Sequence, residues 1–328
     1  MQLISYHGRM PNFGDDLNAC LWPALAPELF DGDREDGFLG IGTVIGMPVS
    51  GLRTLHVFGS GIGNNRLDQW RDQAVRYWCV RGPISARLVG VSADLAMTDG
   101  AVLTPLVPGF PAAAAGGGGT VIVPHWETLD HPGWPAVAAA TGFELIDPRA
   151  DPRVVVERIA RADLVLTEAM HGAIIADTYG IPWIAFATSK NFGSTKWVDW
   201  TMSLGLEFDL TLIPPPSPRQ ILAFGRGDGK YGETFGVGVD AALRDFEERV
   251  GAANPAAKPA LRNLAKRTIQ QSSWIHPLLG FNPLRTSRML TRLATGKPCL
   301  SAESVRLGLR ARLQERLAAV VAEHRAQS

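Results

Sequence analysis

Short apolar runs alternate with helix-length amphipathic segments along this chain. Runs with the length of buried parallel strands lie at 3–6, 54–58, 77–80, 120–123, 143–146, 164–166 and 183–187. Segments with helical spacing lie at 15–25, 83–89, 133–141, 152–161, 172–180, 195–204 and 240–250, and the apolar, glycine-rich segment 38–47 also favours a helix. This alternation predicts an α/β fold with two doubly wound parallel sheets.

Two breaker-rich segments divide the pattern. The string PLVPGFPAAAAGGGG at 105–119 and the segment 253–259 are typical of linkers. A length of 328 residues suits one or two domains. We therefore predict a first domain at 1–108, a linker at 109–119, a second domain at 120–236, a helix at 237–252 that braces the first domain, and a basic helical tail at 253–328.

The formal net charge of zero hides an asymmetry that changes this picture. From Lys258 onward the chain has 13 Lys and Arg against 3 Glu, with Leu, Ile, Trp274 and Phe281 interleaved. Such a segment favours contact with an anionic membrane surface. The alternative is a solvated pair of basic helices, one at 304–324. Nucleic acid is not expected, since the chain has no motif for binding it.

The remaining composition is that of an ordinary globular protein, with 46% hydrophobic and 20% charged residues. The three cysteines have no paired or metal-like spacing, so we expect a reducing compartment and no cysteine-based metal site. Neither a signal-peptide pattern nor an apolar run near the ~20 residues that span a bilayer is present. The expected location is the cytoplasm, at the inner face of the membrane.

Polar residues with catalytic potential follow several of the predicted strands. Glu168 and His171 come after 164–166 and precede a helix, whose first amide groups favour an anion. Ligands of open α/β sheets bind at these carboxyl ends. A simple helix start is the alternative, with Thr167 as its cap.

Other candidate site residues also follow the ends of predicted strands. Arg81 follows 77–80, and its guanidinium suits a phosphate or a carboxylate, or else a surface ion pair. His125 follows 120–123, where a structural role is as frequent. The turn with Ser60 and Gly61 follows 54–58, but Asn64 stands where a dinucleotide motif has its third glycine.

Two further groups lie after strand ends. Asp15 and Asp16 are adjacent carboxylates flanked by Asn12 and Asn18, which is more than a helix cap requires. Lys190 and Lys196 follow the strand at 183–187, where cations could meet a phosphate.

Several of these strings together resemble the polysaccharide pyruvyltransferase family. The string TEAMHG at 167–172 resembles its E-x-x-H-G motif, and NFGDDLN at 12–18 resembles its N-x-G-D-D element. RGPISA at 81–86, PH at 124–125 and KWVDW at 196–200 also resemble family elements, so the resemblance spans about residues 3–213. Ala169 stands where many members have arginine. The resulting string EAMHG resembles the succinoglycan-type branch of the family.

The resemblance implies a GT-B-like pair of Rossmann-like domains that face a cleft. It also implies transfer of pyruvate from phosphoenolpyruvate to two hydroxyls of a sugar, as a ketal, on a lipid-linked exopolysaccharide repeat unit. No metal or other cofactor is expected.

Given that reaction, the residue types indicate their roles. The predicted catalytic residues are His171 as general acid/base, Arg81 and Glu168. The predicted donor-binding residues are Arg81, Lys190, Lys196, Ser60, Gly61, Gly172 and His125. The predicted acceptor-binding residues are Asn12, Asp15, Asp16 and Asn18.

Two alternatives of different classes stay open at this point. One is a GT-B glycosyltransferase that uses a nucleotide sugar, which would share the fold and a phosphate site at a helix N-terminus. The other is a non-catalytic glycan- or membrane-binding protein whose basic tail is its main functional part.

Overall fold

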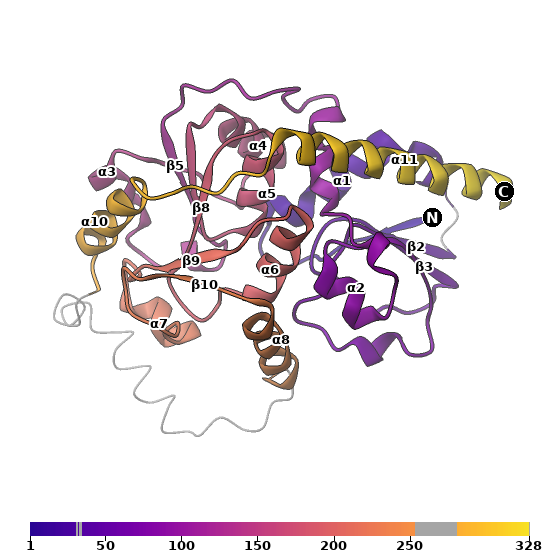
Figure 1. Cartoon of the computed structure of the whole chain (residues 1–328), viewed down its shortest axis with the longest axis horizontal. Helices are drawn as coiled ribbons and strands as arrows, with labels where there is room; N and C mark the ends of the chain where they lie inside the picture. Colours follow the sequence, from indigo (N-terminus) through magenta and orange to yellow (C-terminus); the bar gives the residue numbers. More distant parts are fainter. Residues whose placement is uncertain (31, 33–34, 253–280, 328) are drawn as a thin grey trace.

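The computed structural model describes residues 1–30, 32, 35–252 and 281–327, and it contains two parallel sheets surrounded by helices (Figure 1). The first sheet has the order β1-β2-β3-β4, with all of its strands parallel. Its strands are β1 (Gln2–Ile4), β2 (Asp36–Leu39), β3 (Thr54–Phe58) and β4 (Ala74–Cys79). The helices that go with it are α1 (Phe13–Leu25), η1 (Pro27–Phe30), η2 (Leu67–Trp70), α2 (Pro83–Val89), η3 (Ala93–Leu95) and η4 (Gly100–Leu106).

The second sheet has the order β10-β9-β8-β7-β5-β6, in which β10 alone is antiparallel to its neighbour. Its strands are β5 (Thr120–Val123), β6 (Glu144–Leu145), β7 (Leu164–Thr167), β8 (Trp183–Ala187), β9 (Asp209–Leu212) and β10 (Thr234–Gly236). The associated helices are η5 (Thr128–Asp130), α3 (Trp134–Thr141), α4 (Pro152–Arg161), α5 (Met170–Thr178), α6 (Ser194–Ser203), α7 (Pro218–Phe224) and α8 (Val239–Ala252). Two helices follow, α10 (Pro283–Leu293) and α11 (Glu303–Gln327).

The predicted α/β class with parallel sheets is confirmed. The strand order of the second sheet reverses between β5 and β7, as in a doubly wound sheet. The first sheet runs in consecutive order and has no such reversal. The GT-B-like arrangement stays a prediction.

The helix predicted for 38–47 is wrong. This segment forms the end of β2 and an irregular loop. Gly42 and Gly46 have φ angles of +116° and +81°, which interrupt a right-handed helix. Gly40 leaves room for the indole of Trp22, because a Cβ atom there would lie 1.9 Å from Trp22 Nε1.

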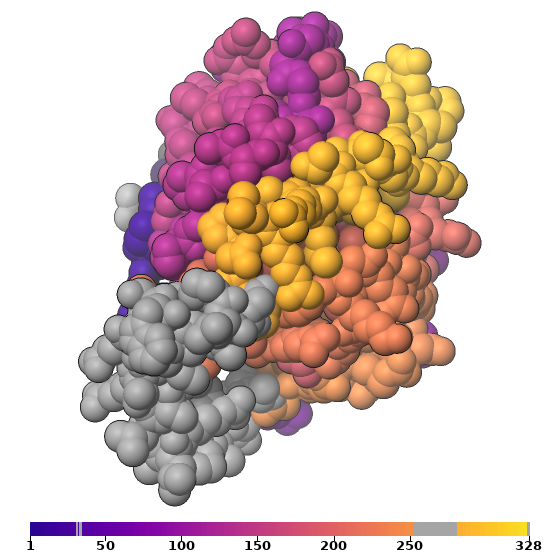
Figure 2. All heavy atoms as spheres, turned by 90° about the vertical axis from the view of Figure 1, so that its left-hand side faces the viewer, coloured from indigo at the N-terminus to yellow at the C-terminus, as the bar shows by residue number. Residues whose placement is uncertain are grey.

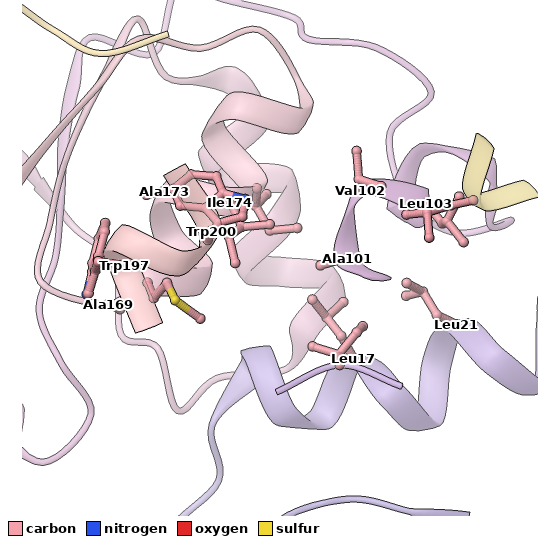
Figure 3. Packing of buried hydrophobic residues seen from close by; sticks show 14 of the residues in the cluster. Leu17, Leu21, Ala101, Val102, Leu103, Ala169, Ala173, Ile174, Trp197 and Trp200 are labelled. Atoms are coloured by element: carbon pink, nitrogen blue, oxygen red, sulfur yellow. The ribbon is translucent and has the colours of Figure 1, made fainter. Parts of the chain in front are cut away.

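One hydrophobic cluster joins the two sheets. Figure 3 shows α1 and η4 from the first part of the chain facing α5 and α6 from the second. Leu17 and Leu21 contribute from α1, Leu103 from η4, Ile174 from α5 and Trp200 from α6, and all are buried. Apolar packing therefore fixes how α1 lies against the start of α5, where the candidate site is found.

The last two helices belong to the folded body. Leu290 and Leu293 of α10 join a second cluster on the α3 side of the second sheet, and Figure 2 shows this segment lying over that side of the molecule. Helix α11 runs from the second sheet across to the first (Figure 1), where it contacts η4, η1 and β4. Helix α8 packs mainly against α6, and the bracing of the first domain predicted for 237–252 stays a prediction.

The predicted solvated helix at 304–324 has one buried face, formed by Leu309, Leu313, Leu317 and Val320. The part of the predicted tail at 253–280, including Trp274, lies outside the described residues. Across the segments that the structure describes, no helix has the length and apolarity required to span a membrane.

Leu313→Ala should destabilise the fold by about 2–5 kcal/mol, because it opens a cavity under α11. Chemical denaturation followed by circular dichroism measures the change. Leu307→Ala is the matched control on the same helix, since Leu307 is 51% exposed and its truncation should change stability by less than about 0.5 kcal/mol. Equal effects of the two variants would contradict the packing of α11.

Candidate active site

A cavity of about 570 Å³ lies where the two sheets face each other. His125 follows β5, and Ala169 and His171 follow β7, so the cavity adjoins the reversal in strand order, where open α/β sheets bind their ligands. Residues from both parts of the chain line it: Tyr6, Asn12, Asp15, Thr43, Val44, Met47, Pro48, Asn64, Asn65, His125, Trp126, Glu127, Ala169, Met170, His171, Asn191, Gly193, Lys196 and Arg249.

His171 is the second residue of α5 and lines this cavity. Its ring packs against Gly14 at the start of α1, where a Cβ atom would lie 2.0 Å from Nδ1. The ring of Phe13 meets it edge-on at 6.4 Å. The glycine of the N-x-G-D-D element is therefore needed so that α1 can approach His171.

Asp15 and Asn12 bring polar groups to the cavity from α1. Asn12 Nδ2 donates a 2.7 Å hydrogen bond to Asp15 Oδ2. Burial raises the pKa of Asp15 above its ordinary value, while the neighbouring His171, the hydrogen bond from Asn12 and Lys196 oppose the rise. The carboxylate thus lies within electrostatic reach of a histidine and a lysine.

The other two predicted acceptor-binding residues have structural roles. Asp16 Oδ2 accepts a hydrogen bond from the backbone N–H of Asn12 at 3.1 Å. Asn18 is fully buried, and its side chain binds Trp22 Nε1 and both backbone groups of Ile41. Neither Asp16 nor Asn18 lines the cavity.

Two cations reach the cavity, Lys196 from α6 and Arg249 from α8. Lys196 has no hydrogen bond or ion pair with any residue in the described ranges. Burial and the nearby arginines lower its pKa to about 8. Arg249 is held by Asp245 Oδ1 at 2.8 Å and by the carbonyl of Phe192 at 2.7 Å.

His125 lines the cavity as a neutral imidazole. Burial and the charges of Lys196 and Arg249 lower its pKa to about 3. Its Nδ1 lies 3.2 Å from Asn191 Nδ2, which also donates to Glu127 at 2.7 Å. His125 therefore offers hydrogen bonding and not a positive charge.

The backbone at the start of α5 also faces the cavity, through Ala169 at the N-cap and Met170 at the first helical position. Amide groups in a first helical turn have no partner within the helix, and the helix dipole favours negative charge there. This end of α5 is suited to an anion.

Glu168, predicted as catalytic, is buried and held by hydrogen bonds from two neighbouring segments. Its Oε1 accepts from the backbone N–H and the hydroxyl of Thr188, at 2.8 and 2.5 Å. Its Oε2 accepts from Thr128 Oγ1 at 2.6 Å and from the backbone N–H of His125 at 3.2 Å. Burial raises its pKa while these hydrogen bonds oppose the rise. Glu168 thus fixes the segments that follow β5 and β8, and it forms no hydrogen bond or ion pair with His171.

Arg81 lies behind the cavity wall and not in it. The fully buried guanidinium donates to Asp199 Oδ2 at 3.2 Å, to Thr43 Oγ1 at 3.0 Å and to the carbonyl of Ile62 at 2.8 Å. Asp199 also accepts from the backbone N–H and the hydroxyl of Ser85, at 2.9 and 2.6 Å. The RGPISA and KWVDW strings therefore join the two parts of the chain, and Arg81 supports Thr43 in the wall.

The other predicted donor-binding residues do not line the cavity. Ser60 donates to the carbonyl of Gly40 at 2.5 Å. Gly61 leaves room for the Arg81 guanidinium, and Gly172 for the Thr167 hydroxyl. Lys190 is exposed and faces Asp228 at 3.5 Å.

Arg249 and Asp99 are among the residues at the site that were not found from the sequence. Arg249 belongs to an amphipathic helix in which basic residues are ordinary, so it carries no local signal. Asp99 is the N-cap residue of η4, and its Oδ2 is 3.8 Å from His171 Nε2. A search for polar residues after every strand misses both, because neither follows a strand.

Parallel strands that end at a cavity with cations and a helix N-terminus are typical of an α/β enzyme site, and such a site suits an anionic ligand. Residues 45–190 match the family model described as polysaccharide pyruvyl transferase. The chain is also 33% identical over 292 residues to the succinoglycan biosynthesis protein ExoV of Rhizobium meliloti (strain 1021), covering 84% of this chain and 90% of that protein. The chain belongs to the polysaccharide pyruvyl transferase family, which confirms the resemblance in its motifs. No solved structure matches it.

Proposed function

We propose that this protein transfers pyruvate from phosphoenolpyruvate to two hydroxyls of a sugar in an exopolysaccharide repeat unit and forms a pyruvate ketal. The observation that carries the proposal is the cavity in which His171, Asp15, Lys196 and Arg249 meet beside the start of α5. Family membership supports pyruvyl transfer, and the relative's role in succinoglycan biosynthesis supports a polysaccharide acceptor.

The charges of the cavity suit the donor. Phosphoenolpyruvate carries a phosphate and a carboxylate, which require cations and N–H donors. Lys196, Arg249 and the first amides of α5 provide them. In our proposal, Lys196 and Arg249 together supply the positive charge that Ala169 lacks.

The reaction needs a proton at the methylene carbon, which is bonded to the carbon that carries the phosphate. A proton adds to the methylene carbon, and the first sugar hydroxyl attacks the oxocarbenium-like carbon beside it. The bond from that carbon to the phosphate oxygen then breaks, and the second hydroxyl closes the ketal ring. His171 is the proposed acid/base, because imidazole exchanges protons near neutral pH. Asn12 and Asp15 are the proposed hydroxyl-binding groups.

The GT-B-like domain arrangement and the peripheral membrane contact stay predictions. A lipid-linked acceptor would bring the protein to the membrane surface. Exposed basic residues such as Arg312 of α11 are available for anionic lipids. Co-sedimentation with vesicles that contain anionic lipid tests this contact.

The direct test is phosphate release from phosphoenolpyruvate with a membrane glycolipid extract as acceptor. We expect release that depends on the acceptor. If phosphoenolpyruvate yields no phosphate and a nucleoside diphosphate raises the melting temperature, the protein is instead a glycosyltransferase that uses a nucleotide sugar. If neither compound has an effect, a non-catalytic glycan-binding protein fits best.

Lys196→Ala should raise the KM for phosphoenolpyruvate about 10- to 100-fold, which corresponds to losing one charged hydrogen bond of about 1.5–3 kcal/mol. Initial rates measure the change. Lys190→Ala is the matched control, since that lysine is exposed and outside the cavity. The same KM in Lys196→Ala and Lys190→Ala would remove Lys196 from the donor site.

The rate should also depend on pH through Lys196. Its pKa is lowered to about 8, so its positive charge is lost as the pH rises through that value. We expect kcat/KM for phosphoenolpyruvate to fall above pH 8, and Lys196→Arg to move the fall to higher pH because arginine stays charged. A fall at the same pH in both proteins would contradict the assignment.

A further inference from the structure

Two buried polar atoms face each other beside the cavity, and neither has a hydrogen-bond partner among the described residues. They are Oδ2 of Asp99 and Nε2 of His171, which lie 3.8 Å apart. A buried polar atom without a partner costs free energy, so each such atom requires an explanation. Asp99 is fully buried and His171 is 8% exposed, which leaves water little access to the pair.

The position of Asp99 is fixed by contacts that leave Oδ2 unused. Its Oδ1 accepts the backbone N–H of Ala101 at 3.0 Å and so caps η4. The following Gly100 packs against the Trp22 ring, where a Cβ atom would lie 2.7 Å away. The carboxylate is therefore held in place by η4 and α1, and its second oxygen is directed to His171.

The two nitrogens of His171 have different surroundings. Nε2 is shielded beside Asp99, whereas Nδ1 is not among the buried atoms that lack a partner. His171 lines the cavity, and Nδ1, beside the backbone of Gly14, has no hydrogen bond to a described residue, so Nδ1 is the nitrogen left for a substrate. A partner on one ring nitrogen sets which nitrogen carries the proton.

We propose that Asp99 is a positioning residue that accepts Nε2–H of His171 and thereby presents Nδ1 to the cavity as the proton-transferring atom. This proposal rests on the proposed pyruvyl transfer. A closer approach of η4 and α5 by less than 1 Å, from 3.8 Å to ordinary hydrogen-bond distance, completes the contact.

The proton balance follows from this arrangement. The imidazolium gives its Nδ1 proton to the methylene carbon of the donor, so an N–H bond breaks and a C–H bond forms. Nε2 keeps its proton, which Asp99 holds. Of the two sugar hydroxyl protons released later, one returns to Nδ1 and the other leaves with the phosphate.

Charged groups from two elements act on His171, and a lysine from a third element acts on one of them. Asp99 belongs to η4, and Asp15 on α1 interacts with His171 through its charge. Lys196 on α6 acts on the same Asp15. Glu168 is excluded, because its oxygens are bound to other donors. Within the described segments, Asp99 is the carboxylate that contacts a ring nitrogen of His171.

Nitrogen-15 NMR of histidine-labelled protein tests the proposal without any substrate, so its outcome is separate from that of the proposed reaction. The His171 signals are assigned by their loss in His171→Ala. We expect the neutral ring to be the Nε2–H tautomer in the native protein. Asp99→Asn should shift a large share of it to the Nδ1–H tautomer. A native ring that is mainly Nδ1–H, or an unchanged tautomer in Asp99→Asn, would overturn the proposal.

A second buried aspartate provides the matched control. Asp177 lies on the same helix as His171 and binds Ser301 and Trp183 on the side away from the cavity. Asp177→Asn should leave the His171 tautomer unchanged.

In the assay with phosphoenolpyruvate, Asp99→Asn should lower kcat about 10- to 100-fold, as for other residues that orient a functional histidine, with the donor KM unchanged. If Asp99→Asn does not fold, the tautomer of His171 in the native protein alone tests the proposal.

Discussion

Replacement of His171 by alanine is expected to lower the rate of acceptor-dependent phosphate release by a factor of about 10²–10⁴, the usual contribution of a general acid/base. The variant removes the imidazole that lines the cavity, while the cations Lys196 and Arg249 stay in place. The donor should therefore still bind. Calorimetric titration with phosphoenolpyruvate separates this loss of chemistry from a loss of binding.

His131→Ala provides the control for the loss of an imidazole. His131 packs edge-on against Phe224 and does not line the cavity. Its replacement should leave the rate within twofold of the native value. A His171→Ala variant with native rate would exclude a proton-transfer role for His171, whatever the substrate.

Replacement of Asp199 by alanine is expected to destabilise the protein by about 3–5 kcal/mol, because it leaves the Arg81 guanidinium buried without its counter-charge. Both side chains are fully buried, and the two Ser85 hydrogen bonds would be lost as well. Urea denaturation measures the free energy of unfolding. Because α2 and α6 belong to different sheets, this tie also holds the two walls of the cavity together.

A surface pair is the matched control. Arg66 and Asp68 form an exposed ion pair at 2.5 Å, and Asp68→Ala should not change stability measurably. The double variant Arg81→Met, Asp199→Leu should be more stable than Asp199→Ala alone, because no charge is then left without a partner. If Asp199→Ala unfolds at the same urea concentration as the native protein, the buried pair does not stabilise the fold as expected.

Much of the fold could be predicted from the sequence because its signals are local. The apolar run that forms β8 and the helix of α2 that begins at Pro83 are set by neighbouring residues. The glycine-rich segment after β2 misled the prediction, since its apolar residues suggested a helix while Gly42 and Gly46 adopt left-handed conformations.

The residues of the site were predicted only in part, because the residue type does not show whether a side chain lines the cavity or is held elsewhere in the fold. His171, Asp15 and Lys196 line the cavity, in agreement with their predicted positions after strand ends. Arg81 and Glu168 follow strands equally well, yet hydrogen bonds to distant segments hold both away from the cavity. These partners are 118 and 40 residues away in the sequence, so no local pattern contains them.

The position of α11 has a consequence for how the chain folds during synthesis. Arg310 of this helix binds the carbonyl of Val102, 208 residues earlier, and Arg325 binds Glu28, 297 residues earlier. The apolar surface of η4 and η1 therefore stays uncovered while most of the chain leaves the ribosome. Contacts of such sequence separation form late and slow the final folding step. Nascent chains that end before α11 should bind chaperones, and release should follow once α11 has emerged.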